Sequence, residues 1–556
     1  MAELLSGKGP HLGRFGARFR QPQRTMLHVL RAQADERPDK VWLSFEHAEL
    51  TFGEAQRQVN LVADALTGDL GRGCHVGLFL RNQVEFFPAF YGAMTSGGVA
   101  VPLNADARGP LLEQVIVKSD IRVLVTCAEL VPQLEALASL GAVELVVVAG
   151  EGTFSDSLHS ARVVALDAWL AGRSAAPAKS LPDSSDVAMI QFTSGTTGQA
   201  KGVVYPHHFL YLYSATVTDG QGHSEGDVLT TPLPLSHAAA QHIVANAALH
   251  AGCRAHLSTR FSASTFWQEV ADCGATFAIL LGPLAGILLK TVRDIPEHRL
   301  KRLFCVPFPP AGEEFERRFG VRLVWQGYGM TEIYPHPMQA VMEEGVPYDT
   351  VGHAAAWMDY GAVDEQDRLL PPGEIGQLVY RPRLADAMTR GYYKDPRTTL
   401  DAFRNFMFHT GDLGFVDEEG RVHYAGRVQD RIRRRGENIS AAELEAIALG
   451  HPAVVEAAAV GVPGEFGEDE VKLDVAATGG DLDVPAFHAW FAERVPRYMV
   501  PLYIEVHDEL PKSTSAKIQK HKLVEAGVDR PAVHVFHPRR QPASPGRRAG
   551  GESGGG

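Results

Sequence analysis

Apolar runs of strand length alternate with helical patterns through the first part of the chain. Residues 76–80, 123–126 and 145–149 are apolar runs typical of buried strands, whereas residues 52–66 and 111–118 follow helical periodicity. This alternation predicts parallel βαβ units with both faces of the sheet covered.

A second alternating set extends over residues 228–324, after which the pattern changes. Residues 374–428 contain short strands and turns, which predict a small β-rich subdomain. A compact α+β pattern follows, with helices at 440–449 and 484–494 and strands at 454–460 and 502–506.

The chain of 556 residues exceeds what one hydrophobic core usually holds, so at least two domains are expected. We predict an α/β fold with a large domain at residues 27–428 and a small α+β domain at residues 429–536. A loose N-terminal arm at residues 1–26 precedes them. Residues 537–556 are rich in Pro, Gly, Ser and Arg and cannot bury a core, so a disordered tail is predicted.

The formal net charge of -13 argues against nucleic acid or an anionic membrane as the main partner. The N-terminal arm lacks the continuous apolar core of a secretory signal. Residues 273–289 form the longest uncharged stretch of helical pattern, but they are too short for a membrane span and contain Pro283, so a buried core segment is predicted. Five cysteines without CxxC spacing indicate neither a zinc site nor disulfides. They suit a reducing cytosol, and we expect a cytoplasmic protein.

Residues 191–204, QFTSGTTGQAKGVV, combine hydroxyls, glycines and one lysine between two apolar runs. Glycine lets backbone N–H groups approach phosphate oxygens where a Cβ would clash, and hydroxyls and a lysine add donors and charge. A flexible Ser/Gly linker would lack the flanking apolar runs, and the order of glycines and lysine differs from a Walker loop. We therefore predict a polyphosphate loop that includes Thr193, Ser194, Gly195, Thr196, Thr197, Gly198, Lys201 and Gly202.

Four further segments follow the loop along the chain: YGMTE at 328–332, HTGD at 409–412, residues 426–438, and residues 511–517, PKSTSAK. Together with the loop they resemble the adenylate-forming superfamily, which includes acyl- and aryl-CoA synthetases, peptide-synthetase adenylation domains and beetle luciferases. The resemblance covers about residues 27–524. It implies a large N-terminal domain of two αβαβα-type subdomains and a small β-barrel, followed by a mobile C-terminal domain.

The resemblance implies ATP, Mg²⁺ and coenzyme A as cofactors or co-substrates and a carboxylic acid as the small-molecule partner. The loop from Thr193 to Lys201 would hold the β- and γ-phosphates, and Glu332 with Thr193 would hold Mg²⁺ through hard oxygen ligands. Thr331 would hydrogen-bond the α-phosphate, and Tyr328 would stack on adenine. Taken alone, the YGMTE segment is equally typical of a buried aromatic beside a turn.

Asp412 would accept hydrogen bonds from both ribose hydroxyls, and Arg427 would help to hold ribose and phosphates. Lys517 is the implied catalytic lysine, because a long ammonium neutralises the carboxylate and the α-phosphate as they meet. In isolation, Asp412 would be interpreted as a residue that caps a turn. Arg427 would be interpreted as an ordinary surface arginine, and Lys517 as one of several exposed lysines. Their common order with the other motifs favours the functional interpretation.

His237 would line the acid pocket, and Gly436 would line the pantetheine tunnel. His242 follows His237 at a spacing that is not typical of a helical metal site, and a structural histidine is the favoured interpretation of it. Trp325, Gln326 and Gly327 are expected to form one wall beside Tyr328.

Residues 266–270 and 318–323 look most like crotonobetaine/carnitine-CoA ligase relatives, which favours an ATP-dependent acid:CoA ligase that releases pyrophosphate. Two departures bear on the acceptor: Arg435 replaces a small residue beside Gly436, and Ala516 replaces the glycine before Lys517. The alternative is an adenylating enzyme that passes its acid, or another oxyanion such as nitrite, to a carrier protein or a small nucleophile such as an amine in specialised metabolism. A binding-only relative is disfavoured because Lys517 and Glu332 are both retained.

Two more positions depart from the resemblance. Residues 307–312, PFPPAG, stand where an adenine-contacting segment is expected, so no adenine ligand is named there. Gln429 stands at the hinge where Asp or Lys is usual, yet a hinge depends more on backbone torsions than on one side chain. The acid itself is not predicted, because pocket walls come from distant segments. A homodimer is common among such relatives.

Overall fold

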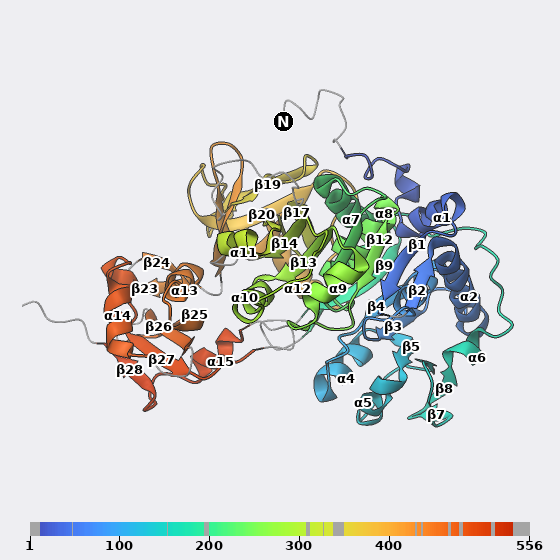
Figure 1. The fold of residues 1–556 in the computed structure, drawn as a ribbon, viewed down its shortest axis with the longest axis horizontal. Helices are drawn as coiled ribbons and strands as arrows, with labels where there is room; N and C mark the ends of the chain where they lie inside the picture. The colour runs from blue at the N-terminus through green and yellow to red at the C-terminus, as the bar shows by residue number, and fades with distance from the viewer. Residues whose placement is uncertain are drawn as a thin grey trace, which may run out of the picture. The chain divides into compact units, whose positions relative to one another are not determined.

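The computed structural model describes residues 12–46, 48–152, 154–193, 200–306, 312–325, 327–336, 350–428, 431–434, 437–464, 469–477, 482–512 and 518–536. Contacts between Cα atoms divide the chain into two compact units, residues 1–425 and 426–556, which are described separately (Figure 1). The domain boundaries inferred from sequence stay predictions.

A seven-stranded sheet in the first unit has the order β15-β14-β13-β11-β12-β1-β2. Its core pairs are parallel, and only the β1–β2 hairpin is antiparallel. Its strands are β1 (Val41–Phe45), β2 (Ala48–Thr51), β11 (Val228–Thr231), β12 (Arg254–Leu257), β13 (Phe277–Leu281), β14 (Arg302–Val306) and β15 (Arg322–Val324).

An eight-stranded sheet has the order β10-β9-β4-β3-β5-β6-β8-β7, and its centre is parallel. The strands predicted at 76–80, 123–126 and 145–149 are confirmed as β3, β5 and β6. The strands are β3 (His75–Phe79), β4 (Val99–Pro102), β5 (Ile121–Cys127), β6 (Leu145–Ala149), β7 (Ser157–Leu158), β8 (Ala161–Ala165), β9 (Val187–Thr193) and β10 (Lys201–Pro206).

Helices cover these sheets because their apolar faces find partners there, and the predicted helices at 52–66 and 111–118 are confirmed as α2 and α4. The helices of the first unit are α1 (Met26–Glu36), α2 (Phe52–Leu70), α3 (Phe86–Thr95), α4 (Gly109–Lys118), α5 (Val131–Glu135), α6 (Leu166–Leu170), α7 (His207–Gln221), α8 (Asn246–Ala251), α9 (Phe266–Cys273), α10 (Gly282–Thr291), α11 (Gly312–Phe319) and α12 (Pro396–Ala402). A π-helix, η4 (Ala239–Ala245), leads into α8. Short 3-10 turns lie at Gln21–Gln23, Ala128–Leu130 and Arg404–Phe406.

Trp42 of β1 joins the two sheets in one core. Its ring is fully buried and stacks on Phe52 of α2 at 6.2 Å between centroids, and it also contacts Phe87 of α3 at 5.3 Å. Its indole N–H donates to the Ala245 carbonyl at 3.1 Å. In the chain, α3 connects β3 to β4 of the eight-stranded sheet, whereas Trp42 belongs to the seven-stranded sheet. One aromatic cluster therefore fixes the two sheets to each other.

The predicted β-rich subdomain is a five-stranded antiparallel sheet of order β18-β22-β21-β20-β19. A separate hairpin, β16 (Tyr328–Met330) and β17 (Ile333–His336), precedes it. The sheet consists of β18 (Thr350–Gly352), β19 (Met358–Val363), β20 (Gly376–Pro382), β21 (Phe408–Val416) and β22 (Val422–Arg427).

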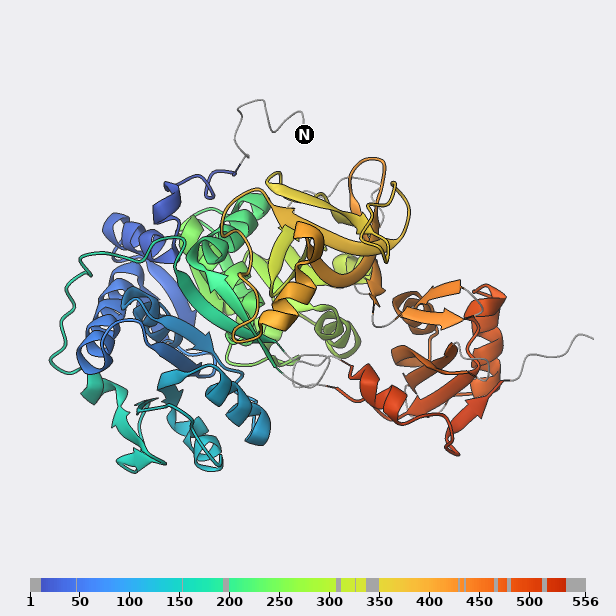
Figure 2. The same cartoon turned by 180° about the vertical axis from the view of Figure 1, so that it is seen from behind.

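The N-terminal arm is not loose where the structure describes it, which corrects the prediction for residues 12–25. The Phe15 and Gly16 amides donate to the Asp219 carboxylate at 3.1 and 3.3 Å, and the Tyr211 hydroxyl donates to the Phe15 carbonyl. Phe15 itself is buried. The arm therefore runs along α7 in both views (Figures 1 and 2), because an apolar ring and paired amides offset the cost of ordering it.

Residues 273–289 are not one helical segment, which corrects a second prediction. They contain the end of α9, the buried strand β13 and most of α10. The burial is as predicted for β13, where Phe277 and Ala278 are inaccessible to solvent. A short apolar run carries no period that separates strand from helix, and Gly282-Pro283 starts the helix. In the described part of the chain, no helix combines the length and apolarity that crossing a membrane requires.

The second unit contains a four-stranded sheet of order β25-β26-β27-β28 and a β23–β24 hairpin. The predicted helix–strand–helix–strand order is confirmed by α13, β25, α14 and β27. The elements are β23 (Arg431–Arg434), β24 (Glu437–Ser440), α13 (Ala441–Leu449), β25 (Val454–Pro463), β26 (Asp469–Ala477), α14 (Val484–Ala492), a 3-10 turn (Arg497–Met499), β27 (Tyr503–His507), α15 (Lys520–Glu525) and β28 (Val533–Val535). The predicted tail at 537–556 lies outside the described residues.

Candidate active site

The polyphosphate loop predicted from sequence begins and ends on a β-hairpin. Thr193 ends β9, Lys201 begins β10, and the two are direct partners in the antiparallel ladder. The Lys118 ammonium donates to the Ala200 carbonyl at 3.0 Å beside the hairpin. The remaining predicted loop residues, Ser194, Gly195, Thr196, Thr197 and Gly198, lie outside the described residues. The ladder thus holds a hydroxyl and an ammonium opposite each other at the base of the loop.

A side-chain amide connects this hairpin to the segment that carries His237. The Gln191 amide of β9 donates to the Ser236 carbonyl at 2.7 Å. His237 is exposed. Its backbone carbonyl accepts a hydrogen bond from the backbone amide of Gln241 at 3.4 Å, at the start of η4. A π-helix turn is uncommon and frequently occurs at functional sites, so it marks this segment.

His242, in contrast, is fully buried within η4. Burial lowers its pKa to about 3, and its ring packs against Tyr213 at 4.9 Å between centroids. Asn246 approaches its Nδ1 atom at 3.3 Å. A neutral, packed imidazole agrees with the structural interpretation of this histidine.

The YGMTE segment forms the β16–β17 hairpin, with Thr331 and Glu332 at its turn. The backbone carbonyls of both turn residues accept hydrogen bonds from other segments. The Tyr205 hydroxyl donates to the Thr331 carbonyl, and the Thr389 backbone amide donates to the Glu332 carbonyl at 3.0 Å. Glu332 is buried at 6% exposure. A buried carboxylate is retained only where it is paired or ligated, so this position is a candidate for function.

Tyr328 and Asp412 meet although their motifs are far apart in sequence. The Tyr328 hydroxyl donates to Asp412 Oδ2, and Asp412 lies in β21 with 6% exposure. Burial and the neighbouring Asp412 charge raise the pKa of Tyr328, so its phenol stays a donor. The ring is offset-stacked 6.0 Å from Tyr380. An aromatic ring and a carboxylate are therefore fixed beside each other.

Tyr392 is the residue of this site that sequence analysis missed. Its hydroxyl donates to Glu332 Oε1 at 2.8 Å, and the Lys201 ammonium lies 5.3 Å from its ring centroid. One ring thus contacts the lysine of the loop hairpin and the carboxylate of the YGMTE turn. The GYYK sequence at 391–394 carries no signal for this role, because the contacts join residues from three separate segments.

Three predicted residues belong to the second unit. Arg427 ends β22 and is exposed, whereas Gly436 and Lys517 lie outside the described residues. The ends of the Lys517 segment are described: Lys512 pairs with Ile518 in an antiparallel bridge, and the Gln519 amide donates to the Pro511 carbonyl at 2.7 Å. Gln326, Gln429, Arg435, Ala516 and residues 307–311 also lie outside the described residues.

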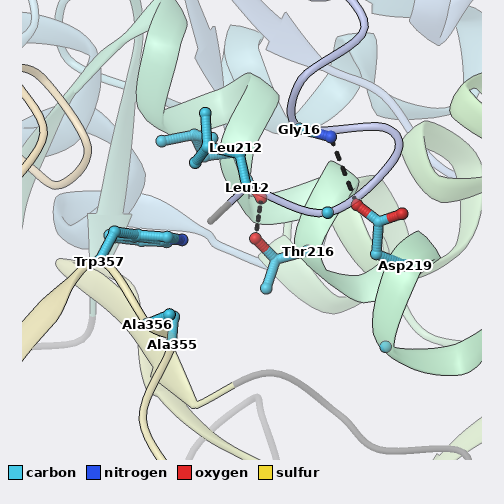
Figure 3. Close-up of a pocket in the computed structure, with 10 residues that line it drawn as sticks. Leu12, Gly16, Leu212, Thr216, Asp219, Ala355, Ala356 and Trp357 are labelled. Carbon is cyan, nitrogen blue, oxygen red and sulfur yellow. Dashed lines mark hydrogen bonds between the residues drawn. The ribbon is translucent and has the colours of Figure 1, made fainter. Parts of the chain in front are cut away.

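A surface hollow of about 280 Å³ lies away from these residues, between the N-terminal arm and α7 (Figure 3). Its lining includes Leu12, Leu212, Thr216 and Trp357. The Gly16 amide meets Asp219 at its edge. None of the predicted site residues that the structure describes lines it.

The donor set of the first unit fits a nucleotide with a divalent cation. Glu332 and the Thr193 hydroxyl are hard oxygen ligands of the kind that Mg²⁺ prefers, and Lys201 supplies a positive charge. Asp412 accepts hydrogen bonds, and Tyr328 offers an aromatic face.

Comparison with known proteins agrees with this chemistry. Residues 30–393 match the family model described as AMP-binding enzyme, and residues 443–517 match the AMP-binding enzyme C-terminal domain. The chain is 30% identical over 515 residues to the crotonobetaine/carnitine–CoA ligase of Salmonella arizonae, covering 87% of this chain and 96% of that protein.

Solved structures give the same fold. The anthranilate CoA ligase AuaEII in complex with anthranoyl-AMP superposes with a TM-score of 0.81 at 23% identity, covering 92% of this chain and 98% of that one. ATP-bound MatB from Rhodopseudomonas palustris gives a TM-score of 0.79 at 25% identity, covering 90% and 99%. Fold and site thus define an adenylate-forming enzyme. The chain belongs to the AMP-binding enzyme family, among its AMP-forming acid–CoA ligases.

Proposed function

We propose that this enzyme joins a carboxylic acid to coenzyme A in two steps. The acid oxygen attacks the α-phosphorus of ATP, the bond to the β-phosphate breaks, and pyrophosphate leaves. The CoA sulfur then attacks the acyl carbonyl, AMP leaves, and the thiol proton passes to solvent. The observation that carries the proposal is that the YGMTE segment contacts both the loop hairpin and Asp412 in a chain of this family. The Tyr205 hydroxyl of β10 donates to the Thr331 carbonyl, and Tyr328 donates to Asp412.

In the first step, Lys201 and the hydroxyls of Thr193, Ser194, Thr196 and Thr197 neutralise and orient the β- and γ-phosphates, while Gly195 and Gly198 admit them to the backbone. Mg²⁺, when bound, supplies charge neutralisation at the phosphates. Glu332 and Thr193 are the residues that would hold it.

Tyr328, Thr331 and Asp412 bind the nucleoside part. Asp412 keeps the Tyr328 hydrogen bond on Oδ2 and accepts from the ribose hydroxyls as well, and Tyr328 offers its ring to adenine. The Thr331 hydroxyl donates to the α-phosphate. These donors and acceptors are pre-oriented by the hairpin and by β21, so little reorganisation is needed when the nucleotide binds.

Lys517 neutralises the carboxylate and the α-phosphate as they meet, and Arg427 assists at ribose and phosphates. Gly436 leaves room for the pantetheine arm, and His237 lines the acid pocket. We expect the enzyme in the cytoplasm, where its five free cysteines stay reduced, and a homodimer is the assembly to test first.

The test is acid-dependent pyrophosphate release over a panel of aryl, short-chain and fatty acids, with and without CoA, while AMP and thioester are followed by mass spectrometry. A CoA-dependent thioester with one acid class is the expected result. Adenylate or AMP without thioester would overturn CoA as the acceptor and favour a carrier protein or small nucleophile.

A second experiment tests the lysine. Lys517→Ala should lose pyrophosphate release at least a hundredfold while it still converts preformed acyl-adenylate and CoA to thioester. Lys512→Ala is the matched control, because Lys512 pairs with Glu456 and Glu509 instead. Full adenylation by Lys517→Ala would contradict the assigned role.

A further inference from the structure

Tyr392 contacts two of the residues to which the proposed function assigns roles, and it reaches them from a third segment. Its hydroxyl donates to Glu332 Oε1 at 2.8 Å. The Lys201 ammonium lies over the face of the same ring, 5.3 Å from the centroid, within the range of a cation–π contact. A single side chain therefore connects an acidic group and a cation that belong to different motifs.

Contacts with neighbouring segments hold the backbone around Tyr392 in place. Tyr392 pairs with Val203 in an antiparallel bridge, and the Val204 amide donates to the Gly391 carbonyl at 3.0 Å. The Tyr392 amide donates to Thr399 Oγ1 at 2.9 Å. Gly391 has φ +107°, and a Cβ there would approach Thr399 Cγ2 to 2.4 Å, so only glycine fits. These contacts attach residues 391–392 directly to β10, whose first residue is Lys201.

The chemistry of the phenol suits a fixed donor. A neutral donor on one carboxylate oxygen restricts the rotation of the Glu332 side chain, which is itself only 6% exposed. The negative ring face restrains the lysine at the same time.

We propose that Tyr392 is a positioning residue of this enzyme, which orients the Glu332 carboxylate through its hydroxyl and the Lys201 ammonium through its ring. The proposal rests on the proposed function, because it assumes that Glu332 holds a divalent cation and Lys201 holds phosphate. The two contacts of Tyr392 are chemically separable, since phenylalanine removes the hydroxyl and keeps the ring.

The next residue supplies a matched control. The Tyr393 hydroxyl donates to Asp120 Oδ2 at 2.7 Å, and the Lys394 ammonium lies 5.7 Å from its ring centroid. Tyr393 thus repeats the carboxylate–phenol–lysine arrangement, but Lys394 and Asp120 are 55% and 42% exposed and form their own ion pair. Tyr393→Phe likewise removes a phenolic hydroxyl from the adjacent residue of the same loop, but one that is bonded to Asp120 and not to Glu332.

The experiment measures cation binding and turnover separately in the full chain. Mn²⁺ is titrated into enzyme with ATP, and free Mn²⁺ is followed by electron paramagnetic resonance. Tyr392→Phe should raise the Mn²⁺ concentration for half-saturation about tenfold or more, the usual effect of losing a partner of a metal ligand, while Tyr393→Phe should not. At saturating Mn²⁺, the KM for ATP of Tyr392→Phe should stay within about twofold of the wild-type value.

Tyr392→Leu, which removes ring and hydroxyl, should raise the KM for ATP as well, because Lys201 loses its support. Equal Mn²⁺ affinity of Tyr392→Phe, Tyr393→Phe and wild type would overturn the proposal. If Tyr392→Leu does not fold, Tyr392→Phe still tests the hydrogen bond to Glu332. That outcome would contradict a positioning role of the ring that is separate from folding. Failure of the proposed function is distinct: wild-type enzyme would then release no pyrophosphate with any acid.

Discussion

Tyr328 donates its phenolic hydrogen to Asp412, which joins two motifs 84 residues apart in one site. The hydrogen bond fixes an aromatic ring of the β16–β17 hairpin against an acceptor of β21. Both partners are thereby placed before a nucleotide binds, which lowers the entropy cost of binding.

The first prediction concerns this pair. Tyr328→Phe keeps the ring but releases Asp412, so the KM for ATP should rise about three- to tenfold, equivalent to about 1 kcal/mol. The measurement is ATP–pyrophosphate exchange at varied ATP. Tyr360→Phe is the control, because its hydroxyl donates to the Gly420 carbonyl, and it should leave the KM unchanged. An unchanged KM in Tyr328→Phe would show that the hydrogen bond does not orient Asp412 for nucleotide.

The second prediction concerns the N-terminal arm. Asp219→Ala leaves the buried Phe15 and Gly16 amides without their acceptor, which should cost about 1–3 kcal/mol and expose the arm. Limited proteolysis should then cleave between residues 14 and 24 faster than in the wild type. Asp401→Ala, at an exposed position of α12, is the control. Equal cleavage rates in all three proteins would contradict the anchoring of the arm.

The third prediction is a pH dependence. Burial lowers the pKa of His250 to about 3, so the folded protein keeps it neutral, whereas the unfolded chain takes up a proton near pH 6.5. Between these values the unfolded state binds more protons, so stability falls as the pH falls below about 6.5. The loss is about 1.4 kcal/mol for each pH unit and each such histidine.

His250→Phe should therefore lower stability at pH 7 but reduce the loss between pH 6.5 and pH 5 by about 2 kcal/mol. Thermal melting of the first unit as a function of pH measures this slope. Parallel curves for His250→Phe and wild type would show that His250 is not the source of acid sensitivity.

The fourth prediction concerns a buried charge cluster in the second unit. The Lys472 ammonium is inaccessible to solvent and lies 2.8 Å from Asp474 and 2.9 Å from Glu505. Lys472→Met removes the buried cation between Asp474 and Glu505, which keep His507 and Arg530 as partners, and should destabilise the second unit by about 3–5 kcal/mol. The triple variant Lys472→Met, Asp474→Leu, Glu505→Leu should recover most of that loss.

The measurement is the melting temperature of the second unit in the full chain. Arg494→Met breaks an exposed pair with Glu493 in the same unit and should change stability by about 0–1 kcal/mol. If the triple variant is no more stable than Lys472→Met, the prediction is wrong. The cluster would then stabilise the second unit by more than the mutual neutralisation of its charges.

Sequence alone was sufficient for many of the elements and for the family. The strands β3, β5 and β6 and the helices α2, α4, α13 and α14 follow from local periodicity, because each segment must present an apolar face to a core. The family could be identified from short motifs for a similar reason. A phosphate-binding loop and a carboxylate that binds a cation are each defined by the residue types within a short segment.

Local patterns failed where the decisive contact was distant. The arm at 12–25 has little periodicity, and its order depends on Asp219 and Tyr211, about 200 residues away. Residues 273–289 carry no period that separates strand from helix, and their division into β13 and α10 is decided by pairing with β11 and β14.

The sequence by itself determined which residue types were available to bind a nucleotide and in what order they follow along the chain. Only the tertiary structure decided which of them meet: Tyr328 contacts Asp412, and Tyr392 contacts both Glu332 and Lys201. The physical reason is that hydrogen bonds and cation–π contacts act over a few ångströms, so a pair from distant segments exists only after sheets and core have brought those segments together.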